Sequence, residues 1–298
     1  MNSQVFLVNL MKKIEFPEEA EGVFLELYQR IVKDSAFTER MKELVHLFME
    51  KEYGKAFEDT DRLAEDMGIH EYTMSMLLLL LCTEPLYGHY QGKGLPEQLF
   101  LDTMKDLTYK LNECKQVYDI WGNFVRSWYP GFYEMTRFAL GRMQYEYEEF
   151  KLEEFKKGGI TVRKGDRVIN MHIPSCGAFT WDIRLDSYRK AYEFYKGDFN
   201  GKPIPMVCDS WLLYPGHREF LPERLNIRGF MNDFSYIEGF TRESFEDAWR
   251  VFGSDFKKAP EDLSRETSLQ RAYAEHLEKG GKTGTGYGIF LFDGEKII

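Results

Sequence analysis

The spacing of apolar residues changes partway along this chain of 298 residues. Over roughly the first 120 residues, apolar side chains recur every three or four positions, as in 20–31, which predicts helices. From "MQYEY" (143–147) onward, apolar and polar residues alternate, which predicts strands with one polar face. The change in spacing therefore predicts two domains, a helical one over 1–120 and a mixed α/β one over 121–298.

Within the second domain, strands are expected to alternate with helices after an opening hairpin. Lys156 to Gly159 ("KKGG") has the composition of a hairpin connection. Helical spacing returns over 180–196, in "TRESFEDAWRVFG" and in "TSLQRAYAEHLEKGG". The expected strands of the central sheet are 142–150, 167–173, 206–213, 226–235 and 286–292.

Charge is distributed unevenly between the two expected domains. Residues 1–120 hold 13 Lys and Arg against 22 Asp and Glu (−9), and the remainder holds 26 against 27 (−1), which together give the chain its −10. An acidic first domain repels phosphate backbones, so we expect no nucleic-acid partner. The apolar run 76–82 is far shorter than the about 20 residues that cross a bilayer, and no signal segment opens the chain. We therefore expect a cytoplasmic protein with no membrane partner.

The cysteines are spaced too widely for a typical metal site or a small disulfide scaffold. We expect reduced thiols and no metal centre. The residues concerned are Cys82, Cys114, Cys176 and Cys208.

The stretch "LAEDMGIHEYTMSMLL" has the cadence of a DNA-binding helix-turn-helix. Its second helix, "EYTMSMLLLLL", offers no Arg or Lys for phosphates or guanine edges, and it lies in the acidic domain. We therefore predict an ordinary helix pair within a bundle.

The glycine-rich stretch "EKGGKTGTGYG" (278–288) resembles a phosphate-binding loop. A P-loop needs its glycines after a strand and before a helix, whereas these glycines follow a predicted helix and precede a predicted strand. We predict a flexible helix-to-strand connection, with backbone contact to a ligand as the alternative.

The junction Pro174-Ser175-Cys176-Gly177 joins an alternating strand to the helix predicted over 180–196. Its unpaired backbone N–H groups and the helix dipole would suit a phosphate or an oxyanion, and a plain turn is the other interpretation. His172, just before the junction, is a candidate general base, because imidazole titrates near neutral pH; a structural hydrogen bond is the alternative. Glu146 and Glu148, on the polar face of a strand, could hold a water or an amine, or could simply be solvated.

Three segments carry a resemblance to a known family: "HIPSCGAFTWDIRLDSYRKAYEFY", "VCDSWLLYPGHREFLPERLNIRGFMNDF" and "LQRAYAEHLEKGGKTGTGYGIF". They resemble bacterial acyltransferase-domain proteins, in which a helical N-acyltransferase domain precedes a GNAT-like domain. The resemblance covers nearly the whole chain, and in its helical half it rests on "YGHYQGKGLPEQLFLDTMKDL" (87–107). It implies an α+β protein, with an N-terminal helical domain followed by a GNAT-like mixed α/β domain whose central sheet is mostly antiparallel.

The resemblance also implies a cofactor-binding turn. In the GNAT plan the fourth strand splays from the fifth, and the turn after the fourth, normally Gln/Arg-x-x-Gly-x-Gly/Ala, binds coenzyme A pyrophosphate through backbone amides. Here 168–173 corresponds to the fourth strand, 174–180 to the turn and 206–213 to the fifth strand; only a Gly-Ala pair matches the glycine pattern. The residues implied in coenzyme A binding are Ile173, Ser175, Cys176, Gly177, Ala178 and Thr180.

The implied reaction is direct attack of an amine on an acyl thioester. It needs a base for the ammonium proton, a backbone N–H for the oxyanion and an acid for the thiolate. The implied bases are His172 and Glu146, and the implied acids are Ser210 and Tyr214. Asp209, where many relatives are expected to carry His, and Trp211 are implied to line the acceptor site.

The function implied by the resemblance is therefore transfer of an acetyl or other acyl group from acyl-CoA to a small-molecule or peptide amine, without a metal. The rival hypothesis is a non-catalytic protein that binds or senses an acyl-CoA or another small ligand in the same cleft. Aromatic residues around the expected cleft suit either interpretation, or simple core packing.

Overall fold

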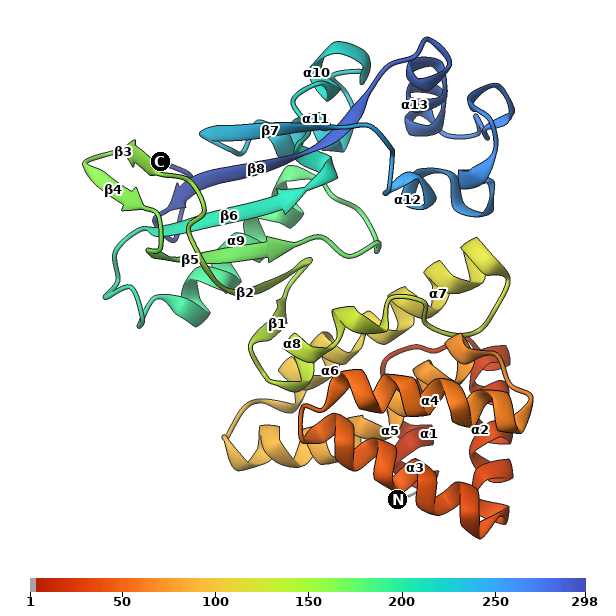
Figure 1. Cartoon of the computed structure of the whole chain (residues 1–298). Helices are drawn as coiled ribbons and strands as arrows, with labels where there is room; N and C mark the ends of the chain where they lie inside the picture. Colours follow the sequence, from red (N-terminus) through yellow and green to blue (C-terminus); the bar gives the residue numbers. More distant parts are fainter. Residues whose placement is uncertain (1–3) are drawn as a thin grey trace. The chain divides into compact units, whose positions relative to one another are not determined.

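The computed structural model describes residues 4–298, which form two compact units, Met1–Phe138 and Ala139–Ile298. In Figure 1 the first unit runs from red to yellow and the second from green to blue. The first is helical and the second contains the sheet, which confirms the predicted fold class. No helix in the described part of the chain is both long and apolar enough to cross a membrane.

The first unit is built around α5 (Glu71–Gly92). This helix is apolar on all sides, and its residues 77–82 are fully buried, as expected for a helix at the centre of a bundle. The helices that accompany it are α1 (Gln4–Lys13), α2 (Glu18–Lys33), α3 (Ser35–Met49), α4 (Tyr53–Met67), α6 (Glu97–Met104), α7 (Asp106–Tyr118), the 3-10 turn η1 (Arg126–Trp128) and α8 (Pro130–Tyr133).

The helix-turn-helix cadence corresponds to α4 and α5. Gly68 ends α4 in the left-handed conformation (φ 64°), and the His70 side chain accepts a hydrogen bond from the Tyr72 N–H at the start of α5. Because α5 is buried among the other helices, it cannot enter a DNA groove. The predicted helix pair within a bundle is what the structure contains.

The helical unit extends beyond the boundary expected near residue 120. Asn123 donates its N–H to Tyr72 O, and the Tyr133 hydroxyl donates to Leu79 O at 2.6 Å. Arg126 forms a bidentate ion pair with the Asp61 carboxylate. These contacts hold 121–136 on the helices, so the structure places the change of unit at Phe138.

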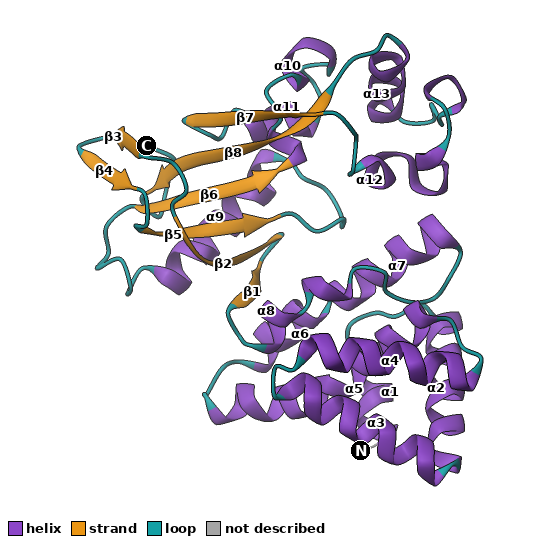
Figure 2. Ribbon diagram, viewed as in Figure 1, coloured by secondary structure: helices purple, strands orange, loops and turns teal. Residues whose placement is uncertain are grey.

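The second unit contains a six-stranded sheet with strand order β1-β2-β5-β6-β8-β7 (Figure 2). The pair β5–β6 is parallel, while β2–β5, β6–β8 and β7–β8 are antiparallel, so the sheet is mostly antiparallel as expected. The strands are β1 (Arg137–Leu140), β2 (Met143–Glu149), β5 (Arg167–His172), β6 (Ile204–Ser210), β7 (Tyr236–Arg242) and β8 (Thr283–Phe292).

The two faces of this sheet are covered differently. On one face lies α9 (Trp181–Tyr195), where Tyr188 packs edge-on against Phe290 and the Tyr195 hydroxyl donates to Tyr145 O. On the other face, at one end, lies the hairpin β3 (Glu154–Lys157)–β4 (Ile160–Arg163), which the sequence predicted at "KKGG". Its Phe155 and Val162 share a core with Val168, Val207, Tyr287, Ile289 and Leu291. Beyond the hairpin, β2, β5 and β6 carry Glu146, Asn170, His172 and Asp209 on that face.

One buried ion pair fixes α9 to the segment before β7. Arg184 Nε lies 2.6 Å from Asp233 Oδ2, and the Tyr188 hydroxyl donates to the same oxygen at 2.9 Å. Burial raises the pKa of Asp233, although the bonds from Arg184 and Tyr188 oppose the shift. The pair therefore orients the helix that follows β5.

One predicted element of the second unit was wrong, and two others are shorter than predicted. Residues 226–235, predicted as a strand, begin with α11 (Asn226–Met231), because Ile227, Phe230 and Met231 recur at helical spacing and are buried. The helix predicted in "TRESFEDAWRVFG" is only α12 (Ala248–Phe252), because Thr241 and Arg242 end β7. The strand predicted over 206–213 ends at Ser210 and continues as the 3-10 turn η2 (Trp211–Leu213). The remaining helical elements are α10 (His217–Phe220), η3 (Gly253–Lys257), η4 (Pro260–Asp262) and α13 (Ser268–Glu278).

The glycine-rich stretch forms the turn after α13 and the first half of β8. A Cβ at Gly284 would lie 2.1 Å from Phe240 O, and one at Gly286 would lie 2.2 Å from Leu213 O. These glycines let the backbones of β7 and η2 approach β8. Close packing, rather than ligand contact, accounts for them.

Candidate active site

The parallel strands β5 and β6 part before they end. Their register joins Ile169 to Met206 and Asn170 to Val207 and extends no further toward the carboxyl ends. Beyond this point β5 stays paired with β2 as far as His172, and β6 stays paired with β8 as far as Ser210. A sheet whose neighbouring strands separate frees backbone groups for a ligand, so this end of the sheet is the candidate site.

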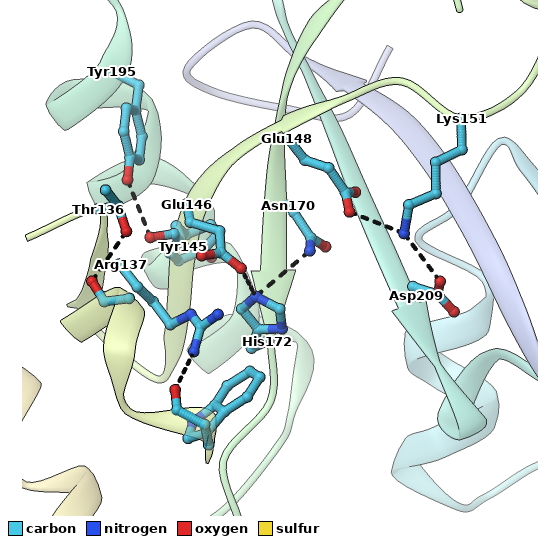
Figure 3. Close-up of polar contacts among 12 residues, drawn as sticks. Thr136, Arg137, Tyr145, Glu146, Glu148, Lys151, Asn170, His172, Tyr195 and Asp209 are labelled. Atoms are coloured by element: carbon cyan, nitrogen blue, oxygen red, sulfur yellow. Dashed lines mark hydrogen bonds and ion pairs between the residues drawn. The ribbon is translucent and has the colours of Figure 1, made fainter. Parts of the chain in front are cut away.

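His172 and Glu146 meet on the sheet face beside this opening (Figure 3). His172 Nε2 lies 2.6 Å from Glu146 Oε1, and each side chain is about one-fifth exposed (18% and 19%). The β2–β5 register explains the contact, because Glu146 lies opposite Asn170 and diagonal to His172 on the same face. A carboxylate that accepts the Nε2 proton leaves the lone pair on Nδ1, so the pair can take up a proton.

A second polar group lies beside the first and includes a residue that the sequence did not predict. Lys151 Nζ lies 2.9 Å from Glu148 Oε1 and 3.2 Å from Asp209 Oδ2, which joins β2 to β6 across β5 (Figure 3). Asp209 lies 58 residues from Lys151, so the sequence alone could not indicate that Lys151 connects Glu148 to it. We call Glu146, Glu148, Lys151, Asn170, His172 and Asp209 the polar cluster.

The turn between β5 and α9 leaves backbone donors available. Among residues 4–298, the N–H groups of Gly177, Ala178, Trp181 and Asp182 have no hydrogen-bond acceptor in the chain. They lie in the turn and in the first positions of α9, where the helix dipole is positive. The arrangement can accommodate an anion such as a phosphate.

Individual turn residues contribute in different ways. Gly177 is exposed with φ 46°, and a Cβ there would meet nothing within 4 Å, so the chain itself leaves the space beside it open. Cys176 N–H donates to Pro174 O at 3.0 Å, which closes a tight turn. Thr180 occupies the N-cap position of α9, but its side chain makes no capping hydrogen bond.

Ser210, Trp211 and Tyr214 have other partners. The Ser210 hydroxyl accepts the Leu212 N–H at 3.2 Å and so caps η2. Because side chains alternate along β6, Ser210 points to the opposite sheet face from Asp209. The Tyr214 hydroxyl lies 3.4 Å from Thr241 Oγ1.

Trp211 belongs to a separate group of rings. Its ring centroid lies 6.0 Å from that of Tyr273 and 6.2 Å from that of His217. We call Trp211, His217, Phe220, Phe245 and Tyr273 the aromatic cluster. Trp211 therefore packs against other rings of the chain, which is the alternative to ligand binding that the sequence left open for the aromatic residues.

Metal chemistry has no evident donor set here. Within residues 4–298, no group of three or more His, Cys, Asp or Glu side chains is arranged to hold a metal ion. The imidazole, carboxylates and ammonium of the polar cluster are groups that transfer protons and recognise charge.

Family models match both units of the chain. The model of the N-acyltransferase N-terminal domain matches residues 5–135, and that of the GNAT-like C-terminal domain matches residues 137–290. No curated protein gives a significant match.

Solved acyltransferase structures share the fold of the whole chain. One, in complex with decanoyl-CoA, has a TM-score of 0.74 and 18% identity over 98% of this chain and 89% of that chain. Another, in complex with decanoyl-CoA and teicoplanin, has a TM-score of 0.69 and 16% identity over the same shares. At this identity the likeness concerns the fold.

Proposed function

Because the chain belongs to the family that joins an N-acyltransferase N-terminal domain to a GNAT-like C-terminal domain, we propose that it is an acyl-CoA-dependent N-acyltransferase. It would transfer an acyl group from a coenzyme A thioester to an amine. We assign the chemistry to the parting ends of β5 and β6.

One observation carries the proposal: a single strand, β5, ends in a proton-accepting pair and leads directly into the anion-compatible turn. His172, bonded to Glu146, closes the strand, and the free N–H groups of the turn and of α9 follow within ten residues. A thioester placed along this edge would have its pyrophosphate near the turn and its reacting end near the base.

The reaction follows from these positions. The amine nitrogen forms a bond to the thioester carbonyl carbon, and the carbon–sulfur bond breaks. His172 takes the proton that the amine loses, and Glu146 stabilises the imidazolium. The departing thiolate needs a proton, for which the sequence suggested Ser210 or Tyr214. Ser210 faces away from the polar cluster, and its hydroxyl already accepts a hydrogen bond from the Leu212 N–H. We therefore assign the role of acid to Tyr214.

Coenzyme A would be held by the residues of the turn. Ser175, Gly177, Ala178 and Thr180 are exposed, and the left-handed φ of Gly177 turns the chain there. Ile173 and Cys176 are half-buried and would line the same path. Phosphate binding at this turn depends on backbone N–H donors. The absence of the Gln or Arg that opens the usual GNAT turn therefore does not remove the anion site.

Structural neighbours suggest the acyl length and the acceptor. They were solved with decanoyl-CoA, octanoyl-CoA and teicoplanin, so we extend the donor from acetyl to medium-chain acyl groups and the acceptor to amines on peptide-like molecules. A coenzyme A substrate also favours the cytoplasm as the place of reaction.

The test measures release of the coenzyme A thiol from acetyl-, octanoyl- and decanoyl-CoA with a panel of amines. We expect thiol release that depends on the amine, with the N-acyl product found by mass spectrometry. Assays without amine control for hydrolysis. Tight acyl-CoA binding without turnover for any amine would instead support a sensing protein.

A further inference from the structure

The ammonium of Lys151 lies among three groups that recognise cations. Glu148 Oε1 and Asp209 Oδ2 lie 2.9 and 3.2 Å from Nζ, and the centroid of the Tyr287 ring lies 5.2 Å away. Two carboxylates and the face of an aromatic ring are typical of a site for an organic ammonium group. The Lys151 ammonium therefore marks a position where this chain stabilises such a group.

Two buried acceptor atoms beside this position have no donor in the described chain. They are Glu148 Oε2 and Asn170 Oδ1, and Asn170 as a whole is only 5% exposed. Figure 3 shows the Asn170 amide between His172 and Glu148, with its oxygen on the Glu148 side. Buried acceptors normally have a partner, so these two atoms indicate capacity for another N–H donor.

Lys151 is the member of this group that lies on a loop. Its side chain is 47% exposed and reaches the carboxylates from the loop after β2, whereas Glu148 and Asn170 are fixed on strands. The pair with Asp209 is exposed on both sides (47% and 45%) and such a pair is worth at most about 1 kcal/mol, so a ligand can displace the lysine from Asp209 at little cost.

We propose that Glu148, Asn170, Asp209 and the Tyr287 ring form a subsite for a second, protonated amine of the acyl acceptor, and that Lys151 occupies it in this structure. The role of the subsite in the reaction rests on the proposed acyltransferase function. Its affinity for ammonium groups does not.

The bound group is not the amine that is acylated. Burial lowers the pKa of Lys151, but the bonds to Glu148 and Asp209 outweigh it, so the net pKa is raised. A site that keeps an amine protonated suppresses its nucleophilicity, so the reacting amine belongs beside His172. Glu148 follows Glu146 by two residues, about 7 Å along the strand. The acceptors that fit carry a second cation at about that distance from the reacting amine.

Chemical rescue of Lys151→Ala tests the subsite without any acyl transfer. The substitution removes the resident ammonium and leaves both carboxylates in place. Ethylammonium chloride at about 100 mM should raise the Tm of the variant by about 2 °C beyond the effect of NaCl at equal ionic strength. Wild type, which supplies its own ammonium, should gain little.

Two further variants serve as controls. Lys151→Met keeps the stem over Tyr287 without the charge, so it should fold and should not be rescued. Glu148→Gln in the Lys151→Ala background should abolish the rescue. Equal Tm shifts in all the proteins would overturn the subsite, as would rescue of Lys151→Met.

The outcome separates the two proposals. Specific rescue in a protein that transfers no acyl group would retain the ammonium site and reject the proposed function. Amine-dependent acyl transfer without rescue would support the proposed function and reject the ammonium site. If both hold, Lys151→Ala should lower the KM for diamines relative to the KM for monoamines, since only a diamine can fill the vacated ammonium position.

Discussion

His172 and His217 lie in the same unit, but their surroundings differ in almost every respect. His172 is about one-fifth exposed (18%), and its partner is the Glu146 carboxylate in the polar cluster. His217 is 1% exposed in the aromatic cluster, where Nδ1 lies 3.3 Å from Leu212 O and Nε2 contacts the Tyr273 hydroxyl. Burial lowers the pKa of His217 to about 4, although the bond to Leu212 opposes the shift.

Glycines of the two regions differ in the same way. A Cβ at Gly177 would meet nothing within 4 Å, whereas one at Gly286 would meet Leu213 O at 2.2 Å. In the aromatic cluster and around β8, the chain itself supplies the partners of each ring and glycine. In the polar cluster and the β5–α9 turn, buried acceptors and backbone donors remain available. The first region is structural, and the second is where we propose that a ligand binds.

The largest effect that separates the regions is expected from His172→Ala. Removing a general base typically costs 100- to 10,000-fold, so we expect kcat for amine acylation to fall by at least about 100-fold. The Tm should change little, because the side chain is partly exposed. Glu146→Gln, which keeps the shape but not the charge, should give a smaller loss. If kcat of His172→Ala stays within about twofold of wild type, the base lies elsewhere.

Gly286→Ala should act on stability instead. Its Cβ would press on the backbone of η2, so we expect about 3 kcal/mol of lost unfolding free energy in urea titrations. Gly177→Ala is the matched control: it adds a methyl group in open space and should cost only about 1 kcal/mol, from the left-handed φ. Similar losses for both variants would remove the distinction between a crowded and an open glycine.

The pH dependence of stability should isolate His217. Its pKa is about 4 when folded and 6.5 when unfolded, so the unfolded chain binds a proton more readily between these values. The contribution of the neutral side chain is therefore complete above about pH 6.5 and is lost as pH falls toward 4, by at most about 3 kcal/mol.

Urea unfolding of wild type and His217→Gln from pH 7 to pH 4 measures this contribution as a difference. The stability advantage of wild type should shrink across that window. An advantage that is constant with pH would show that the two states titrate alike.

Much of the fold could be predicted from local spacing. Alternating apolar and polar residues predicted β2, and apolar residues at helical spacing predicted α9. Each element buries one of its faces, so its own sequence carries the signal. The strand predicted over 226–235 was wrong because the spacing of Ile227, Phe230 and Phe234 suits either a short buried helix or a strand. Packing against η2 and β8 decides between the two.

The site could be predicted only in part. His172 and Gly177 were indicated by their place beside a strand-to-helix junction, which is a local signal. Lys151 and His217 were not, because Asp209 and Tyr273, which place them in their clusters, lie 58 and 56 residues away and meet them only in the folded chain. Trp211 was expected at the acceptor site, but the rings of Phe245, before α12, and Tyr273, on α13, come to lie around it only in the folded chain.

The central claim is that the β5–α9 turn binds coenzyme A, and calorimetric titration of octanoyl-CoA into wild type and Gly177→Val tests it most directly. Gly177→Asn, which tolerates a left-handed φ, separates backbone strain from obstruction. We predict binding to wild type and at least about tenfold weaker binding to Gly177→Val, or ~1.4 kcal/mol, with the helical unit still folded. Equal affinities, or no binding to wild type at millimolar ligand, would contradict the account.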